Sequence, residues 1–154
     1  MIIIVHWVLK MKIKKNNINL RDTLFSGQCF RVVEEVDNSF TLILEDRVVN
    51  IKESGDFLEI ESNKADDLEA VILKYFDLER DYYKINEILI KKDKSLKEII
   101  ASCEGYKILN QPDLEIMISF IISQNNSVRN ISKSIEKLCA SYGDKIEFNG
   151  REYS

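Results

Sequence analysis

The chain has 154 residues, enough for one domain or two small ones, and its 45% hydrophobic and 31% charged residues are typical of a globular protein. The net charge of -4 argues against a strong autonomous nucleic-acid-binding protein but leaves a local binding surface open. A single histidine, His6, excludes a histidine-based metal cluster and a serine–histidine–aspartate triad. The three cysteines form no CxxC pair, so we expect reduced thiols, no metal and no cofactor.

The first part of the chain, to about residue 61, is predicted to be rich in β-strands. Residues 1–9 are apolar but too short to span a bilayer, and they lack a secretory cleavage site, so a strand is the simplest interpretation. The lysines that follow them, at positions 10, 12, 14 and 15, fit a solvated strand edge. Further strands are predicted at residues 29–33, 40–44, 47–52 and 57–61. Their short connections require antiparallel pairing.

The hydrophobic period changes at about residue 65. Apolar residues from Leu68 to Phe76 are spaced 3, 1, 3 and 1 apart, which predicts a helix capped by Asp66 or Asp67. Further helices are predicted at residues 82–90, 95–103 and 128–142, with Gly105 and Gly143 ending the last two. A sheet followed by helices predicts an α+β fold.

Residues 144–154 have no evident partner in the sequence. Ile146, Phe148 and Tyr153 are apolar side chains in this short tail, and we expect them to pack on something further along. The tail therefore predicts that the chain stops in the middle of a domain.

The segment 116–126 is the most distinctive in the chain. Its apolar run follows Pro112, Asp113 and Glu115, which suit a first helical turn, and it predicts a helix at 113–124 that is buried on most of its surface. The run stops at Ser123, Gln124, Asn125 and Asn126, whose side chains compete for backbone hydrogen bonds and disfavour further helix. A plain polar turn between two helices is the alternative interpretation.

Several segments together resemble the 8-oxoguanine DNA glycosylases. They are LFSGQCFR at 24–31, LEAV at 68–71 with KYF at 74–76, SFI followed by the paired asparagines at 119–126, and EKLC with YG at 136–143. The resemblance covers about residues 20–154. It implies a TBP-like antiparallel β-sheet domain at residues 1–80, followed at 81–154 by the start of an α-helical helix-hairpin-helix glycosylase domain. It also implies base-excision repair, in which a flipped 8-oxoguanine is excised from duplex DNA before AP lyase cleavage of the strand.

The resemblance also implies site residues. Gly27 matches a glycine whose backbone carbonyl contacts the extra N–H of 8-oxoguanine, which suits a residue without a side chain; a simple turn glycine is the alternative. Asn125 matches an asparagine that enters the gap left by the flipped base, and Asn126 is a neighbour that caps or shapes the loop. Asn130 stands where eukaryotic-type members carry an arginine that contacts the opposite cytosine.

By the same resemblance, the hairpin, the nucleophilic lysine and the assisting aspartate lie downstream of residue 154. We therefore expect no catalytic residue in this chain and no activity of the chain alone. The expected partners are damaged double-stranded DNA, bound weakly by the isolated chain, and a separately encoded C-terminal half, with no membrane; the expected location is the nucleoid of a bacterial cytoplasm. A non-catalytic module that binds DNA or a partner, and an inactive remnant of a split or frameshifted gene, are the alternatives.

Overall fold

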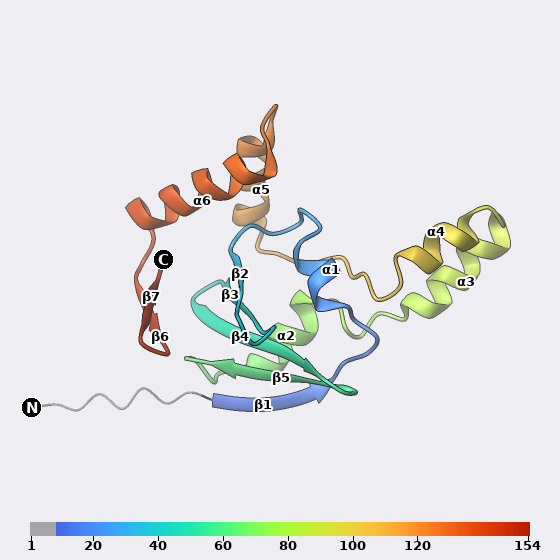
Figure 1. Cartoon of the computed structure of the whole chain (residues 1–154), viewed down its shortest axis with the longest axis horizontal. Helices are drawn as coiled ribbons and strands as arrows, with labels where there is room; N and C mark the ends of the chain where they lie inside the picture. Colours follow the sequence, from blue (N-terminus) through green and yellow to red (C-terminus); the bar gives the residue numbers. More distant parts are fainter. Residues whose placement is uncertain (1–8) are drawn as a thin grey trace, which may run out of the picture.

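A five-stranded antiparallel sheet forms the centre of the molecule in the computed structural model, which describes residues 9–154 (Figure 1). The strand order is β1-β5-β4-β3-β2, and the strands are β1 (Leu9–Lys14), β2 (Val32–Glu34), β3 (Phe40–Leu44), β4 (Arg47–Ser54) and β5 (Phe57–Ser62). The predicted antiparallel sheet is confirmed. The strand predicted at residues 1–9 and His6 lie outside the described residues, except for Leu9, which begins β1.

One face of the sheet carries the hydrophobic core. Helices α1 (Leu20–Leu24) and α2 (Leu68–Tyr75) cover this face, and their buried side chains pack with those of the strands. Alternation along the strands points Leu42, Val49 and Ile51 into the core. Each fully buried Leu or Ile side chain contributes about 1.5–3 kcal/mol to folding. The α+β prediction is therefore confirmed.

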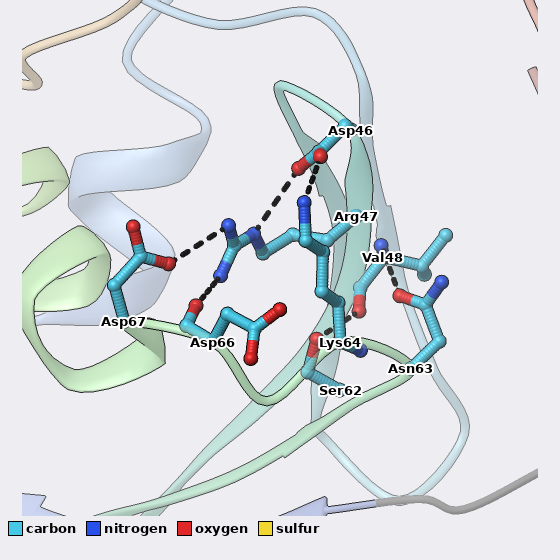
Figure 2. Close-up of polar contacts among 8 residues, drawn as sticks. All are labelled: Asp46, Arg47, Val48, Ser62, Asn63, Lys64, Asp66 and Asp67. Atoms are coloured by element: carbon cyan, nitrogen blue, oxygen red, sulfur yellow. Dashed lines mark hydrogen bonds and ion pairs between the residues drawn. The ribbon is translucent and has the colours of Figure 1, made fainter.

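The start of α2 is held by a buried arginine. Arg47, only 3% exposed, donates from Nη1 to the Asp66 carbonyl at 2.6 Å, and its Nη2 lies 3.0 Å from the Asp67 carboxylate (Figure 2). Asp67 occupies the N-cap position of α2 in a left-handed conformation, with φ of 51°, and its side chain makes no cap hydrogen bond there. The predicted N-cap position is confirmed at Asp67, but the expected side-chain cap hydrogen bond is absent, and the Asp67 carboxylate pairs with Arg47 instead.

Two helices project from the sheet as a pair, α3 (Tyr82–Lys92) and α4 (Leu96–Ser102) (Figure 1). The Asp81 side chain caps α3 by accepting from the Lys84 N–H at 2.9 Å. No residue within either helix is buried. Both predicted helices are confirmed, and both stand largely in solvent in this chain.

Gly105 has a different role from the predicted helix end. The C-cap of α4 is Cys103, and Gly105 lies two residues further on with φ of +81°. Its carbonyl accepts from the Asn19 N–H at 2.8 Å, and an added Cβ would lie 2.9 Å from that nitrogen. The glycine is therefore required for the close approach of this loop to the start of α1.

The last two helices are α5 (Asp113–Ser123) and α6 (Val128–Tyr142), which pack on each other (Figure 1). Gly143 is the C-cap of α6, as predicted. The prediction that α5 is buried on most of its surface is wrong for this chain, because only Ser119 is buried. Few other described elements reach α5, and five of its apolar side chains are between 45% and 66% exposed: Leu114, Ile116, Met117, Phe120 and Ile121.

The C-terminal residues form a hairpin of β6 (Ile146–Phe148) and β7 (Arg151–Tyr153). Thr41, Asn50 and Glu61 are neighbours in register on the face of the sheet opposite the core, and the hairpin lies over this polar row. Phe148 is 2% exposed, and Arg151 donates from Nη1 to both Glu35 carboxylate oxygens at 3.0 and 3.1 Å. The expectation that residues 144–154 lack a partner is therefore wrong.

Within residues 9–154, none of the helices combines the length and the apolar character needed to cross a bilayer.

Candidate functional site

The loop that contains Gly27 follows α1 and precedes β2. Gly27 is exposed and has φ of +85°, in the left-handed region that favours glycine. An added Cβ would meet no atom within 4 Å. The backbone conformation therefore explains the glycine, and the open space beside it leaves the peptide accessible to a ligand.

A side chain next to Gly27 connects this loop to residues 107–109. The Gln28 amide donates from Nε2 to the Lys107 carbonyl at 3.0 Å, and its Oε1 accepts from the Leu109 N–H at 2.9 Å. Nε2 also donates to Ser26 Oγ at 3.0 Å. In return, the Gln111 side chain donates to the Gln28 main-chain carbonyl at 2.6 Å. These bonds connect Gln28 to residues 107–111. The strand predicted at 29–33 begins only at Val32, so its first three residues were predicted wrongly.

The segment that Gln28 contacts is itself well anchored. The Lys107 N–H donates to Thr23 Oγ1 at 3.2 Å, and both residues are buried. Lys107 Nζ lies 4.1 Å from the centre of the Tyr82 ring, and burial lowers the pKa of this lysine. The Tyr82 hydroxyl donates to Asp77 Oδ2 at 2.8 Å and accepts from the Ile108 N–H at 3.0 Å.

A second contact connects the residues after the Gly27 loop to the first turn of α5. The Arg31 guanidinium lies 4.0 Å from the Glu115 carboxylate, and both side chains are largely shielded from solvent. Burial raises the pKa of Glu115, and the positive charge of Arg31 partly opposes that rise. The Gly27 loop is therefore placed beside the N-terminal end of α5.

The asparagine loop, residues 124–127, lies at the other end of α5. Asn125 is exposed with φ of 52°. Asn126 shapes the loop, since its side chain donates to the Ile122 carbonyl at 3.2 Å and accepts from the Ser127 N–H at 3.0 Å. Ser127 caps α6 by accepting from the Asn130 N–H at 3.4 Å, while the Asn130 side chain is exposed.

The predicted site residues thus lie in two groups at opposite ends of one helix. The 11 residues of α5 span about 16 Å, at about 1.5 Å per residue. Gly27 belongs to the group at the first turn, and Asn125, Asn126 and Asn130 belong to the group after the last turn. The connection through Gln28 and Gln111 was missed by sequence reasoning, because it joins residues 83 positions apart; the only signal was the glutamine beside Gly27 in the SGQ motif.

The family of the chain follows from a comparison of its sequence with family models. The model described as "8-oxoguanine DNA glycosylase, N-terminal domain" matches residues 10–117. The chain belongs to this family. The match includes Gly27, Gln28 and Gln111 and ends within α5, so it covers the sheet and the Gly27 loop.

Longer relatives agree with this assignment. N-glycosylase/DNA lyase of Saccharomyces cerevisiae is 27% identical over 89% of this chain and 40% of its own length. MBOgg1, solved with a low-affinity DNA ligand, is 45% identical, with a TM-score of 0.87 over 94% of this chain and 50% of that chain. Clostridium acetobutylicum 8-oxoguanine glycosylase/lyase, solved with DNA containing cytosine opposite 8-oxoG, is 31% identical with a TM-score of 0.83, over 96% and 52% of the two chains. The chain spans about half the length of these relatives.

Proposed function

We propose that this chain is the lesion-recognition part of an 8-oxoguanine DNA glycosylase/lyase that acts in base-excision repair. Residues 1–80 would be its N-terminal domain and residues 81–154 the start of its helical domain. One observation carries the proposal. An exposed left-handed glycine loop lies beside the first turn of α5, and an exposed asparagine loop follows the last turn of the same helix. The solved relatives bound to DNA support damaged duplex DNA as the ligand. The proposed location is accordingly the bacterial cytoplasm, at the nucleoid.

Each loop has a distinct role in the proposal. The Gly27 carbonyl accepts a hydrogen bond from the N–H that 8-oxoguanine has and guanine lacks. Asn125 enters the gap that the flipped base leaves, and its short amide both donates and accepts there. Asn130 lies one helical turn further along and faces the opposite base, while Asn126 keeps the loop in shape.

The outer side of α6 supplies positive charge for this interface. Arg129, Lys133 and Lys137 are exposed and spaced four residues apart, so they form one stripe, opposite the buried Ile131 and Ile135. The stripe begins just after the asparagine loop. It gives a chain of net charge -4 a local surface for phosphates.

A C-terminal half is the second proposed partner, whether it is encoded in the same chain or separately. The relatives are about twice as long as this chain, and the apolar side chains of α5 are exposed in it. Exposed apolar patches of this kind mark interaction sites. The lysine and aspartate that the family resemblance implies would come from that half.

The test is to join residues 1–154 to the C-terminal half of MBOgg1, the relative that is 45% identical. We expect this fusion to excise 8-oxoguanine from duplex DNA and to form a borohydride-trapped adduct, and the 154-residue chain alone to do neither. In the fusion, Asn125→Ala should slow excision by roughly ten- to a hundredfold. A flipped base costs a few kcal/mol of unstacking, and a lost polar contact costs about 1–3 kcal/mol.

The matched control is Asn149→Ala, in the turn of the β6–β7 hairpin. Asn149 has φ of 50° and Asn125 has φ of 52°, so both changes carry the same backbone cost. Excision that is equally fast in both variants would mean that residues 124–127 only connect two helices. Specific binding of lesion DNA without excision by the fusion would favour a non-catalytic binding module instead.

A further inference from the structure

We propose that Gln28 and Gln111 are positioning residues for lesion discrimination, because they fix the direction of the Gly27 carbonyl. This inference rests on the proposed function. It adds two residues that touch neither the lesion nor the reacting atoms and act through the Gly27 peptide.

The need for such residues follows from the glycine itself. Gly27 has φ of +85°, and a glycine peptide without neighbouring restraints samples many orientations. Apart from its two chain neighbours, no heavy atom lies within 4 Å of the position of a Gly27 Cβ, so no tertiary contact on that side restrains the glycine. The hydrogen bonds of Gln28, the residue that shares the peptide with the Gly27 carbonyl, supply a restraint.

Both polar atoms of the Gln28 side chain, Nε2 and Oε1, take part in hydrogen bonds that fix its position. Its two N–H donors are used by Lys107 O and Ser26 Oγ, and Oε1 accepts from the Leu109 N–H. The amide can both donate to the carbonyl and accept from the N–H of the same backbone segment, whereas an ionised carboxylate has no donor. The main-chain side is fixed as well, because Gln111 Nε2 donates to the Gln28 carbonyl at 2.6 Å.

Gln111 also relates the Gly27 loop to α5, because it lies two residues before the first residue of that helix. A carbonyl that is already aligned loses less conformational entropy when it binds the lesion. In the proposal, the Gly27 carbonyl makes one hydrogen bond with 8-oxoguanine that it cannot make with guanine. Loss of the alignment should therefore reduce the preference for 8-oxoguanine about tenfold, the value of one good hydrogen bond.

The first measurement uses the 154-residue chain alone and follows hydrogen exchange of the Leu109 amide. Gln28→Met removes the acceptor of this N–H and should speed its exchange at least about tenfold. Gln28→Glu keeps an acceptor oxygen and should protect Leu109 better than Gln28→Met does. Equal exchange in wild type and Gln28→Met would overturn the inference.

The second measurement uses the fusion with the C-terminal half and compares kcat/KM for 8-oxoguanine and for guanine. Gln28→Met and Gln111→Met should each lower this ratio about tenfold. Cleavage at a preformed abasic site, where no base faces Gly27, should keep its rate in both variants. A merely structural defect would slow abasic-site cleavage as well.

The matched control is Asn110→Ala, in the same segment. The Asn110 amide donates to the Lys74 carbonyl at 2.8 Å, so this change removes a similar bond that leads to α2. An unchanged ratio in Gln111→Met, which keeps all the Gln28 side-chain bonds, would overturn the inference even if Gln28→Met fails to fold. A wild-type fusion that treats both bases alike would instead overturn the proposed function.

Discussion

At the scale of single residues, the chain uses two kinds of left-handed position. Gly105 needs glycine because neighbouring backbone atoms crowd it, whereas Gly27 has open space beside it. Gly105 allows its loop to pack closely on the start of α1. Gly27 makes no such packing contact, so it is the better candidate for a ligand-binding role.

We predict that Gly27→Ala lowers both stability and lesion discrimination. A left-handed alanine costs about 1–2 kcal/mol, which a urea titration of the 154-residue chain measures. In the fusion, the added methyl group beside the carbonyl should erode the preference for 8-oxoguanine over guanine.

Gly55→Ala is the control for this prediction, because Gly55 has φ of +58° and equally open surroundings in the β4–β5 turn. It should cost similar stability and leave the preference intact. A preference that survives Gly27→Ala would show that Gly27 is a plain turn glycine.

At the scale of elements, the hydrophobic spacing of the sequence predicted most helices and strands, because their formation depends on nearby residues. The strands β3, β4 and β5 follow from alternation and turn residues, and α2, α3, α4 and α6 follow from helical spacing. The exposure of α5 could not be predicted, since an apolar run has the same sequence whether or not a partner covers it. The hairpin was missed because its contact with Glu35 joins residues 116 positions apart.

The candidate site was predictable only in part, for the same reason. Gly27 and Asn125 are recognisable from short motifs, but the distance between them depends on the length and packing of α5. The contacts of Gln28 and of Arg31 with the region around α5 are tertiary, and no periodicity reveals them.

We predict that the stripe on α6 contributes to the salt dependence of DNA binding. Each phosphate contact adds about 0.9 to the slope of log K against log salt concentration. Replacing Arg129, Lys133 and Lys137 by glutamine in the fusion should therefore reduce the slope by up to about 3. Fluorescence anisotropy between low and moderate salt measures it.

The control for the stripe is the same change at Lys91, Lys92 and Lys97, on the projecting α3–α4 pair. These lysines are also exposed, but they are more than 25 residues away in sequence from both the Gly27 loop and the asparagine loop. A slope that falls equally in the two triple variants would assign it to overall charge instead of to α6.

At the scale of the whole molecule, the sheet and the last helices differ in how well their apolar surface is covered. The sheet buries its core with α1 and α2, whereas α5 leaves Phe120 and Ile121 more than 60% exposed. We predict that the isolated chain self-associates or binds a hydrophobic dye, which light scattering and dye fluorescence measure.

Phe120→Ser and Ile121→Ser should weaken both signals, since they remove exposed apolar area without touching the sheet core. Val36→Ser, at an apolar residue fully exposed beside β2, is the control and should have little effect. A monodisperse wild-type monomer with a sharp cooperative melt would show that the exposed apolar face of α5 requires no binding partner.

The contact between Arg151 and Glu35 joins segments that leave the ribosome at different times. The sheet strands are complete by Ser62, and most of their contacts are already available while the helices are still being translated. The polar row of the outer face must wait for residues 146–153, which leave the ribosome well after the sheet strands. Loop closure costs about 0.6 kcal/mol for each doubling of length, so we expect the contact spanning 116 residues to form after the shorter-range strand pairings. Until then, Thr41 and Asn50 are open to water, which their polar side chains tolerate and apolar ones would not.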